Sequence, residues 1–216
     1  LDYLKPAHKK LSAFVKKNVS QIVPGDYDYE MAYQQKDKVK PLIPFPVNID
    51  KIKFKPLDVS GKVKIFHGIN RINYYKKGNN HFCEALKQIQ TKYKDRIEIA
   101  QVENIPYKDY KKLYNASHIL LDQTHAYDQG YNALEAMAQG KVVFSGFSDR
   151  FKSHYNISKT IGIHTTPSVE AIVKNLSWLI ENPKEILEIG KNARAYIEAH
   201  HDYKKVAQTY VDTWNS

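Results

Sequence analysis

Two groups of residues in this sequence have the types and spacing that suit a ligand with phosphate and hydroxyl groups. Arg71 and Lys77 stand close to Gly78, where a helix is expected to begin, and Glu135 follows a second glycine, Gly130. Cations neutralise phosphate oxygens, and glycine lets the backbone approach a ligand closely. A carboxylate accepts hydrogen bonds from two vicinal hydroxyls, as in a ribose. The residue types therefore indicate a site for a nucleotide.

Glu135 is expected on a short helix. Four apolar residues recur at i, i+1, i+4 and i+5, namely Ala133, Leu134, Met137 and Ala138. This spacing predicts one apolar face on a helix of roughly two to three turns that starts near Gly130. Gly140 is expected to end it. Tyr131 and Asn132 then lie in its first turn.

Apolar runs on both sides of this helix predict a βαβ unit. Residues 118–122 precede it and residues 142–144 follow it, and both runs suit buried parallel strands. In such sheets ligands bind beyond the carboxyl ends of the strands, here at residues 123–130, where the helix N-terminus favours an oxyanion. A structural reading stays open, because the helix dipole favours a glutamate near the N-terminus and small residues permit close packing.

Alternating apolar runs and helical segments extend the pattern along residues 62–214. Strands are predicted at 63–67, 96–102, 118–122, 141–145 and 161–164, and helices at 78–93, 107–115, 167–180, 183–200 and 202–214. The alternation predicts an α/β fold with a doubly wound parallel sheet and helices on both faces. The loop after the second strand, with Val102 and Ile105 at its ends, is apolar and amide-bearing and suits a flat base.

The first 60 residues have a different character. Leu1–Asn18 predicts a basic amphipathic helix after Pro6, and residues 27–35 suit a second helix. Prolines recur from Pro41 to Pro56, so residues 41–60 are interpreted as an extended linker at a domain boundary.

Composition limits the function classes. The 216 residues carry a net charge of +10, which suits anionic partners such as nucleotides, nucleic acid or an acidic membrane surface. The single cysteine, Cys83, excludes an internal disulfide and a thiolate metal cluster, and its neighbours suit a buried position. Dinucleotide-binding, P-loop, nucleophile-elbow and His-Glu-x-x-His motifs are absent from the sequence. Without an initiating Met, leader or membrane-length apolar run, the chain is interpreted as a piece of a longer, cytoplasmic protein.

Several of these residues also carry a resemblance to a known family. From about Val47 to its end, the chain resembles the C-terminal, nucleotide-sugar-binding domain of a GT-B glycosyltransferase, most like the retaining family 4 group (glycosyl transferases group 1). The resemblance rests on Gly68, Arg71, Lys77–Gly78, the loop 102–107 and above all the stretch Leu134–Gly140 before an apolar strand. Residues 43–48 resemble the interdomain linker of these enzymes.

The resemblance implies a domain plan and a partner set. Residues 1–46 would be the tail of an acceptor-binding domain and the linker, 47–200 the nucleotide-sugar-binding domain, and 201–216 a helix that crosses back. The donor would be a nucleoside diphosphate sugar, with no further cofactor and no metal. The acceptor would be a glycan, lipid or protein, and the rest of the acceptor-binding domain would be missing from this chain. Peripheral contact with the inner face of a membrane is an option, and nucleic acid is not expected.

The resemblance also implies roles for single residues. Glu135 would hold the ribose, and Arg71 and Lys77 the diphosphate; Gly78, Val102, Ile105, Gly130, Tyr131 and Asn132 would complete the nucleotide site. Glu135 is similar to the second acid of a Glu, seven residues, Glu motif, whose first acid falls at Tyr127. Asp128 follows, so Tyr127 and Asp128 are the candidates for contact with the transferred sugar. The alternative function is a non-catalytic nucleotide-sugar-binding or basic nucleic-acid-binding module.

Overall fold

A sheet of five parallel strands forms the centre of the computed structural model, which describes residues 5–33 and 38–215. The strands are β1 (Val63–Ile69), β2 (Ile97–Glu103), β3 (Ile119–Leu121), β4 (Val142–Ser145) and β5 (Ile163–His164). Their order is β2-β1-β3-β4-β5, and every neighbouring pair is parallel. The predicted doubly wound parallel sheet is confirmed, with strand bounds that differ by one or two residues.

Within the described residues, seven α-helices connect or follow these strands, and a short 3-10 helix, Arg71–Asn73, lies between β1 and the first of them. The α-helices are α3 (Asn79–Tyr93), α4 (Tyr107–Ala116), α5 (Tyr131–Ala138), α6 (Asp149–His154), α7 (Val169–Glu181), α8 (Pro183–His200) and α9 (Tyr203–Trp214). The sequence predicted all of them except α6. This helix has six residues, too few for a periodic apolar pattern. Ser148 is its N-cap, and the Ser148 hydroxyl accepts a hydrogen bond from the Phe151 amide.

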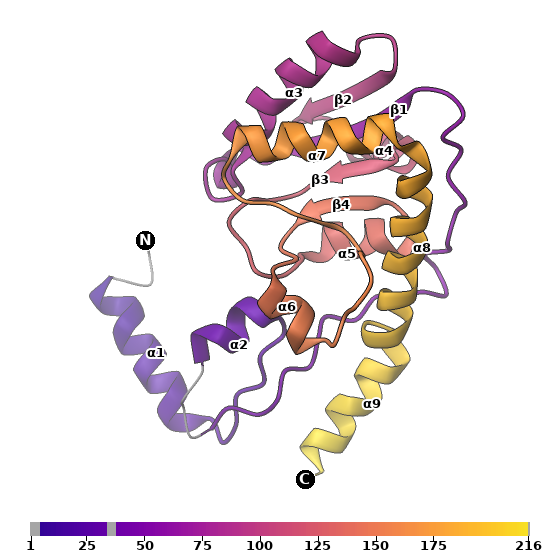
Figure 1. The fold of residues 1–216 in the computed structure, drawn as a ribbon. Helices are drawn as coiled ribbons and strands as arrows, with labels where there is room; N and C mark the ends of the chain where they lie inside the picture. Colours follow the sequence, from indigo (N-terminus) through magenta and orange to yellow (C-terminus); the bar gives the residue numbers. More distant parts are fainter. Residues whose placement is uncertain (1–4, 34–37, 216) are drawn as a thin grey trace. The chain divides into compact units, whose positions relative to one another are not determined.

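Helices cover both faces of the sheet (Figure 1). Alternate strand residues such as Ile65, Ile119 and Phe144 join one core cluster with residues of α3, α7 and α8. On the opposite face, the Phe66 ring makes edge contacts with two tyrosine rings of α4, Tyr110 and Tyr114. The side-chain alternation of the strands thus places α3 and α7 on one face and α4 on the other.

The chain divides into two compact units, Leu1–Pro44 and Phe45–Ser216. Unit 1 contains α1 (Pro6–Asn18), α2 (Tyr27–Tyr33) and an isolated parallel bridge between Ile22 and Val39. The predicted start of α1 after Pro6 is confirmed. The second helix ends at Tyr33, and residues 34 and 35 of that prediction lie outside the described residues. Assignment of unit 1 to an acceptor-binding domain stays a prediction.

Residues 45–47 begin unit 2 and are firmly attached to the junction of α8 and α9. The Val47 amide donates to the His201 carbonyl oxygen over 2.7 Å. The His201 ring lies between the Phe45 carbonyl oxygen (2.8 Å) and the Tyr196 hydroxyl (3.0 Å). Burial lowers the pKa of His201 to about 4. This part of the predicted linker has no regular structure, yet Val47 is buried.

Along residues 5–33 and 38–215, no helix has the length and apolar character that crossing a bilayer requires.

The contact between α8 and the end of α5 predicts a stability change. A Cβ added at Gly190 would lie 2.0 Å from the Gly140 carbonyl oxygen, a backbone atom that cannot swing away. We expect Gly190→Ala to lower the free energy of unfolding by about 1–3 kcal/mol, although alanine is the better helix former. Chemical denaturation measures this. Gly61→Ala is the control, since nothing lies within 4 Å of a Cβ there; an equal effect of both changes would contradict the packing argument.

Candidate functional site

The carboxyl ends of β1, β2 and β3 bring the predicted site residues to one edge of the sheet. Ile69, the last residue of β1, pairs with Glu103, the last residue of β2, and His67 of β1 pairs with Leu121, the last residue of β3. The loops 70–78, 104–106 and 122–130 all leave from this edge. The structure therefore gathers Arg71, Lys77 and the start of α5 on the side of the sheet that the sequence predicted.

An ion pair with a buried carboxylate joins the first and third of these loops. Lys77 Nζ lies 2.8 Å from Asp122 Oδ1; the Lys77 side chain is 30% exposed and the Asp122 side chain only 1%. Asp122 Oδ2 accepts a second hydrogen bond from the Ser145 hydroxyl of β4 over 3.1 Å. The Thr124 amide donates to the Lys77 carbonyl oxygen over 3.0 Å. Lys77 is thus fixed in place by both its backbone and its side chain.

Gly78 allows this loop to close. Its φ of +69° is in the left-handed region, and a Cβ at this position would lie 1.9 Å from the Thr124 hydroxyl oxygen. Gly78 is also the N-cap of α3, and no side-chain hydrogen bond caps that helix among the described residues. The sequence indicated that a ligand would come close to the backbone at Gly78. In the structure the Thr124 side chain lies against this glycine.

Arg71 pairs with a carboxylate that the sequence reasoning did not single out. Its Nε donates to Glu103 Oε1 over 2.7 Å, and its Nη2 contacts Glu103 Oε2. The hydrogen bonds to Glu103 raise the pKa of Arg71, and those from Arg71 lower the pKa of Glu103. Both side chains reach solvent, with 60% of Arg71 and 28% of Glu103 exposed.

The N-terminus of α5 is held by two tyrosines. Gly130 is its N-cap, and within the described part of the chain no side chain caps its first turn. The Tyr114 hydroxyl donates to the Asn132 carbonyl oxygen (2.7 Å), and the Tyr110 hydroxyl donates to Asn132 Oδ1 (3.3 Å). Tyr131 is half-exposed, and its ring stacks on Phe45 with centroids 5.0 Å apart. The helix thus offers its uncapped amides and positive dipole end to the loop in front of it.

Glu135 lies one turn further along α5. Its Oε2 is 3.2 Å from Lys111 Nζ of α4, and the Glu135 side chain is 37% exposed. Lys111 also lies over the Tyr114 ring, 4.6 Å from its centroid. Glu135 is therefore a partly solvated carboxylate with one cationic neighbour, which leaves it able to accept hydrogen bonds from a ligand.

The loop before α5 contains the two candidates for contact with a sugar, Tyr127 and Asp128, which differ in their exposure to solvent. A Cβ at Gly146 would lie 2.5 Å from the Ala126 carbonyl oxygen and 2.6 Å from the Asp128 amide, so this loop packs directly on the residue after β4. Asp128 is buried, and its Oδ1 accepts from the Gln129 amide over 2.6 Å. Tyr127 is 46% exposed. Of the two, Tyr127 is the side chain that a ligand can reach.

The loop after β2 carries the residues expected to contact a base. Val102, near the end of β2, and Ile105, just beyond it, are both partly exposed. Asn104 between them has a φ of +52°, a left-handed conformation that asparagine tolerates better than most residues.

His67 is a buried polar group that sequence reasoning missed, because it stands inside an apolar strand. It is completely buried at the end of β1, and its Nδ1 lies 3.4 Å from the Leu121 carbonyl oxygen. Within the described residues its Nε2 has no hydrogen-bond partner. Burial is the main cause that lowers its pKa to about 4, the nearby Lys77 lowers it further, and Asp122 opposes the shift.

Along the described ranges, 5–33 and 38–215, no three side chains of His, Cys, Asp or Glu come together as a group that could hold a metal ion.

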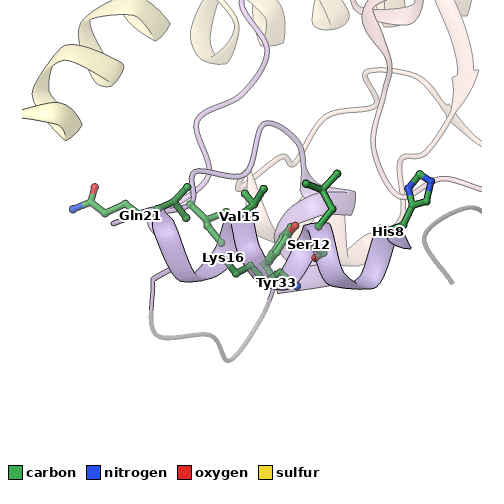
Figure 2. Close-up of a pocket in the computed structure, with 9 residues that line it drawn as sticks. His8, Ser12, Val15, Lys16, Gln21 and Tyr33 are labelled. Atoms are coloured by element: carbon green, nitrogen blue, oxygen red, sulfur yellow. The ribbon is translucent and has the colours of Figure 1, made fainter. Parts of the chain in front are cut away.

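A separate hollow lies along α1 in unit 1 (Figure 2). It has a volume of about 470 Å3 and is lined by His8, Leu11, Ser12, Val15, Lys16, Val19, Gln21, Ile22 and Tyr33. Two of the lining residues, Leu11 and Val15, are exposed. The lining is mainly apolar; it contains the basic side chains of His8 and Lys16 but no carboxylate.

The sequence of unit 2 matches a known protein family. A family model described as glycosyl transferase-like matches residues 65–212, more than half of the chain. The chain belongs to the glycosyl transferase-like family. The resemblance to the C-terminal domain of a GT-B glycosyltransferase is confirmed. A search of the curated proteins found no match.

Solved glycosyltransferase structures share the fold. Sucrose-phosphate synthase from Thermosynechococcus elongatus has a TM-score of 0.72 and 16% identity, over 98% of this chain and 61% of that one. HepE from Anabaena, in complex with UDP and glucose, has a TM-score of 0.72 and 15% identity, over 99% of this chain and 68% of that one. The C-terminal domain of LpcC, a group 1 glycosyl transferase from Francisella tularensis, has a TM-score of 0.53 and 18% identity, over 72% of this chain and 98% of that one. At these identities the likeness shows the fold.

Because His67 is buried in its neutral form, we expect the free energy of unfolding to decrease as the pH is lowered. Its folded pKa of about 4 lies below the ordinary value of 6.5, so the unfolded chain binds a proton first as pH falls. We expect the free energy of unfolding to decrease between pH 6.5 and 4, by up to about 3 kcal/mol from this group, and not to change further through it below pH 4. Denaturation of wild type and His67→Gln across this range measures the difference. His8→Gln, which removes an exposed histidine, is the control; identical slopes for wild type and His67→Gln would refute the expectation.

Proposed function

We propose that the carboxyl edge of the sheet binds a nucleoside diphosphate sugar and that the protein uses it as the donor in glycosyl transfer. One observation carries this proposal: the uncapped N-terminus of α5 stands one turn before a partly exposed carboxylate, Glu135. A helix N-terminus stabilises phosphate oxygens, and the carboxylate can hold the ribose hydroxyls. Membership of the glycosyl transferase-like family and the UDP and glucose in the HepE structure support the same assignment.

The diphosphate would lie between the start of α5 and the loop after β1. The Lys77 ammonium has three N–H donors, of which Asp122 takes one, so the others can reach phosphate oxygens. Arg71 has further N–H donors besides the two that contact Glu103. Val102 and Ile105 would contact the base. We propose that these groups supply the positive charge without a metal; equal donor affinity with a chelator and with added magnesium would support this.

The chemistry would depend on positioning and electrostatics. As the bond between the sugar and the diphosphate breaks, negative charge grows on the leaving phosphate, where Lys77 and the helix dipole stabilise it. The partly exposed Tyr127 would contact the transferred sugar, and the buried Asp128 would hold the loop shape. We propose retained configuration at the sugar, and a glycan, lipid or protein as acceptor. The chain spans 61% of the length of the sucrose-phosphate synthase that it resembles, so the reaction of the whole protein is part of this proposal.

Replacing Glu135 tests the ribose contact. We expect Glu135→Ala to weaken binding of a nucleoside diphosphate by about 1–3 kcal/mol, because a charged hydrogen-bond acceptor is lost. Titration calorimetry against a panel of UDP, GDP, ADP and dTDP measures this. Glu188→Ala, which removes an exposed carboxylate from α8, is the control. Unchanged affinity in a folded Glu135→Ala protein would refute the assignment.

Two lysines at opposite ends of α3 separate a specific phosphate contact from general positive charge. Lys77→Gln should reduce affinity for the nucleoside diphosphate much more than affinity for the nucleoside. Lys94→Gln should change neither strongly, because Lys94 is the exposed C-cap at the far end of α3. Lys77→Arg keeps the charge beside Asp122 and should bind more tightly than Lys77→Gln. Thermal denaturation checks that each variant is folded. If Lys77→Gln weakens nucleoside and diphosphate equally, Lys77 does not contact the phosphates.

A further inference from the structure

Glu103 is placed where it can compete with a ligand for Arg71. It ends β2, and the residue paired with it in β1, Ile69, lies two positions before Arg71. The Arg71 guanidinium uses Nε and Nη2 on the two carboxylate oxygens of Glu103. A carboxylate and a phosphate both present two oxygens that match this planar pair of donors. Glu103 therefore occupies the kind of contact that a phosphate would make.

The guanidinium is held ready for such an exchange. Its Cζ lies 4.9 Å from the centroid of the Tyr74 ring, which restricts where the guanidinium group can move. Residues Arg71, Ile72, Tyr74, Tyr75 and Lys76 line an open hollow of about 510 Å3 beside it. A ligand can thus approach Arg71 without displacing the core.

The ion pairs of Lys77 and of Arg71 differ in how easily they separate. Asp122 is buried, so withdrawing Lys77 would leave an unpaired charge away from water, which is strongly unfavourable. The Arg71 and Glu103 side chains both reach solvent, and water compensates each charge when this pair opens. Of these two pairs, the Arg71–Glu103 pair is therefore the one suited to exchange partners during binding.

We propose that Glu103 is a specificity-determining residue, which occupies the diphosphate contact on Arg71 until a sufficiently anionic ligand displaces it. The inference rests on the proposed function of the same site. A nucleoside brings no charge to replace Glu103, so the Arg71–Glu103 pair stays closed when it binds. A diphosphate replaces the carboxylate with more negative charge. Glu103 thereby lowers affinity for every anionic ligand and sets the charge needed for binding.

The test compares two glutamates of one strand. Glu103→Gln keeps the shape of the side chain but removes the competing charge, and Glu98→Gln removes the same charge from an exposed position nearer the start of β2. We expect Glu103→Gln to tighten binding of the best nucleoside diphosphate from the panel by about two- to fivefold, the change that fits loss of an exposed ion pair. Affinity for the nucleoside should not change, and Glu98→Gln should match wild type.

A double variant tells specific competition from general charge. In an Arg71→Gln background, adding Glu103→Gln should give no further gain, since the group for which Glu103 competes is absent. Unchanged or weaker diphosphate binding by Glu103→Gln would overturn the inference, as would a gain that persists without Arg71 or appears equally in Glu98→Gln. If wild type binds no nucleoside diphosphate of the panel, the proposed function itself fails. If wild type binds and Arg71→Gln weakens binding, that function stands whatever Glu103 does.

Discussion

The ion pair between Lys77 and the buried Asp122 is the constraint on which the candidate site depends. A buried carboxylate beside the middle strand of a parallel sheet is stable only with a cation or hydrogen bonds around it, and Asp122 has both in Lys77 and Ser145. These side chains connect the loop after β1 to the ends of β3 and β4. The ion pair therefore fixes the loop after β1 relative to the loop before α5, and the cation stays at the edge of the sheet without a ligand.

Close packing at two glycines also holds the loop before α5 in place. Gly78 brings the start of α3 against Thr124, and Gly146 brings the residue after β4 against the backbone of residues 126–128. Neither position has room for a side chain, so the loop before α5 is held from both sides. The first turn of α5 is in turn held through Asn132 by two tyrosines of α4, and its amides remain uncapped. Rigidity in the loop and unsatisfied donors in the helix are what an anion site needs.

The sequence predicted the sheet well, because buried parallel strands are apolar runs and the helices between them have a clear period. It also placed Arg71, Lys77 and Glu135 at one edge, since the carboxyl ends of parallel strands share an edge. Their partners could not be predicted. Nothing local shows that Arg71 meets Glu103, 32 residues away, or that Glu135 meets Lys111, because these contacts depend on strand order and helix packing. The contact between the backbone of residues 126–128 and Gly146 could not be predicted either, because it depends on how the loops after β3 and β4 pack.

The path of the chain at residues 45–47 gives the site a thermodynamic link to a distant segment. Phe45 stacks on Tyr131 at the first turn of α5, and its carbonyl oxygen contacts His201 at the end of α8. These contacts connect the first turn of α5, which faces the candidate site, to the end of α8. Linkage is reciprocal: if a bound ligand favoured one position of Phe45 by some factor, fixing Phe45 in that position would strengthen ligand binding by the same factor. Residues 45–47 are thus a segment outside the carboxyl edge through which ligand affinity would be adjusted.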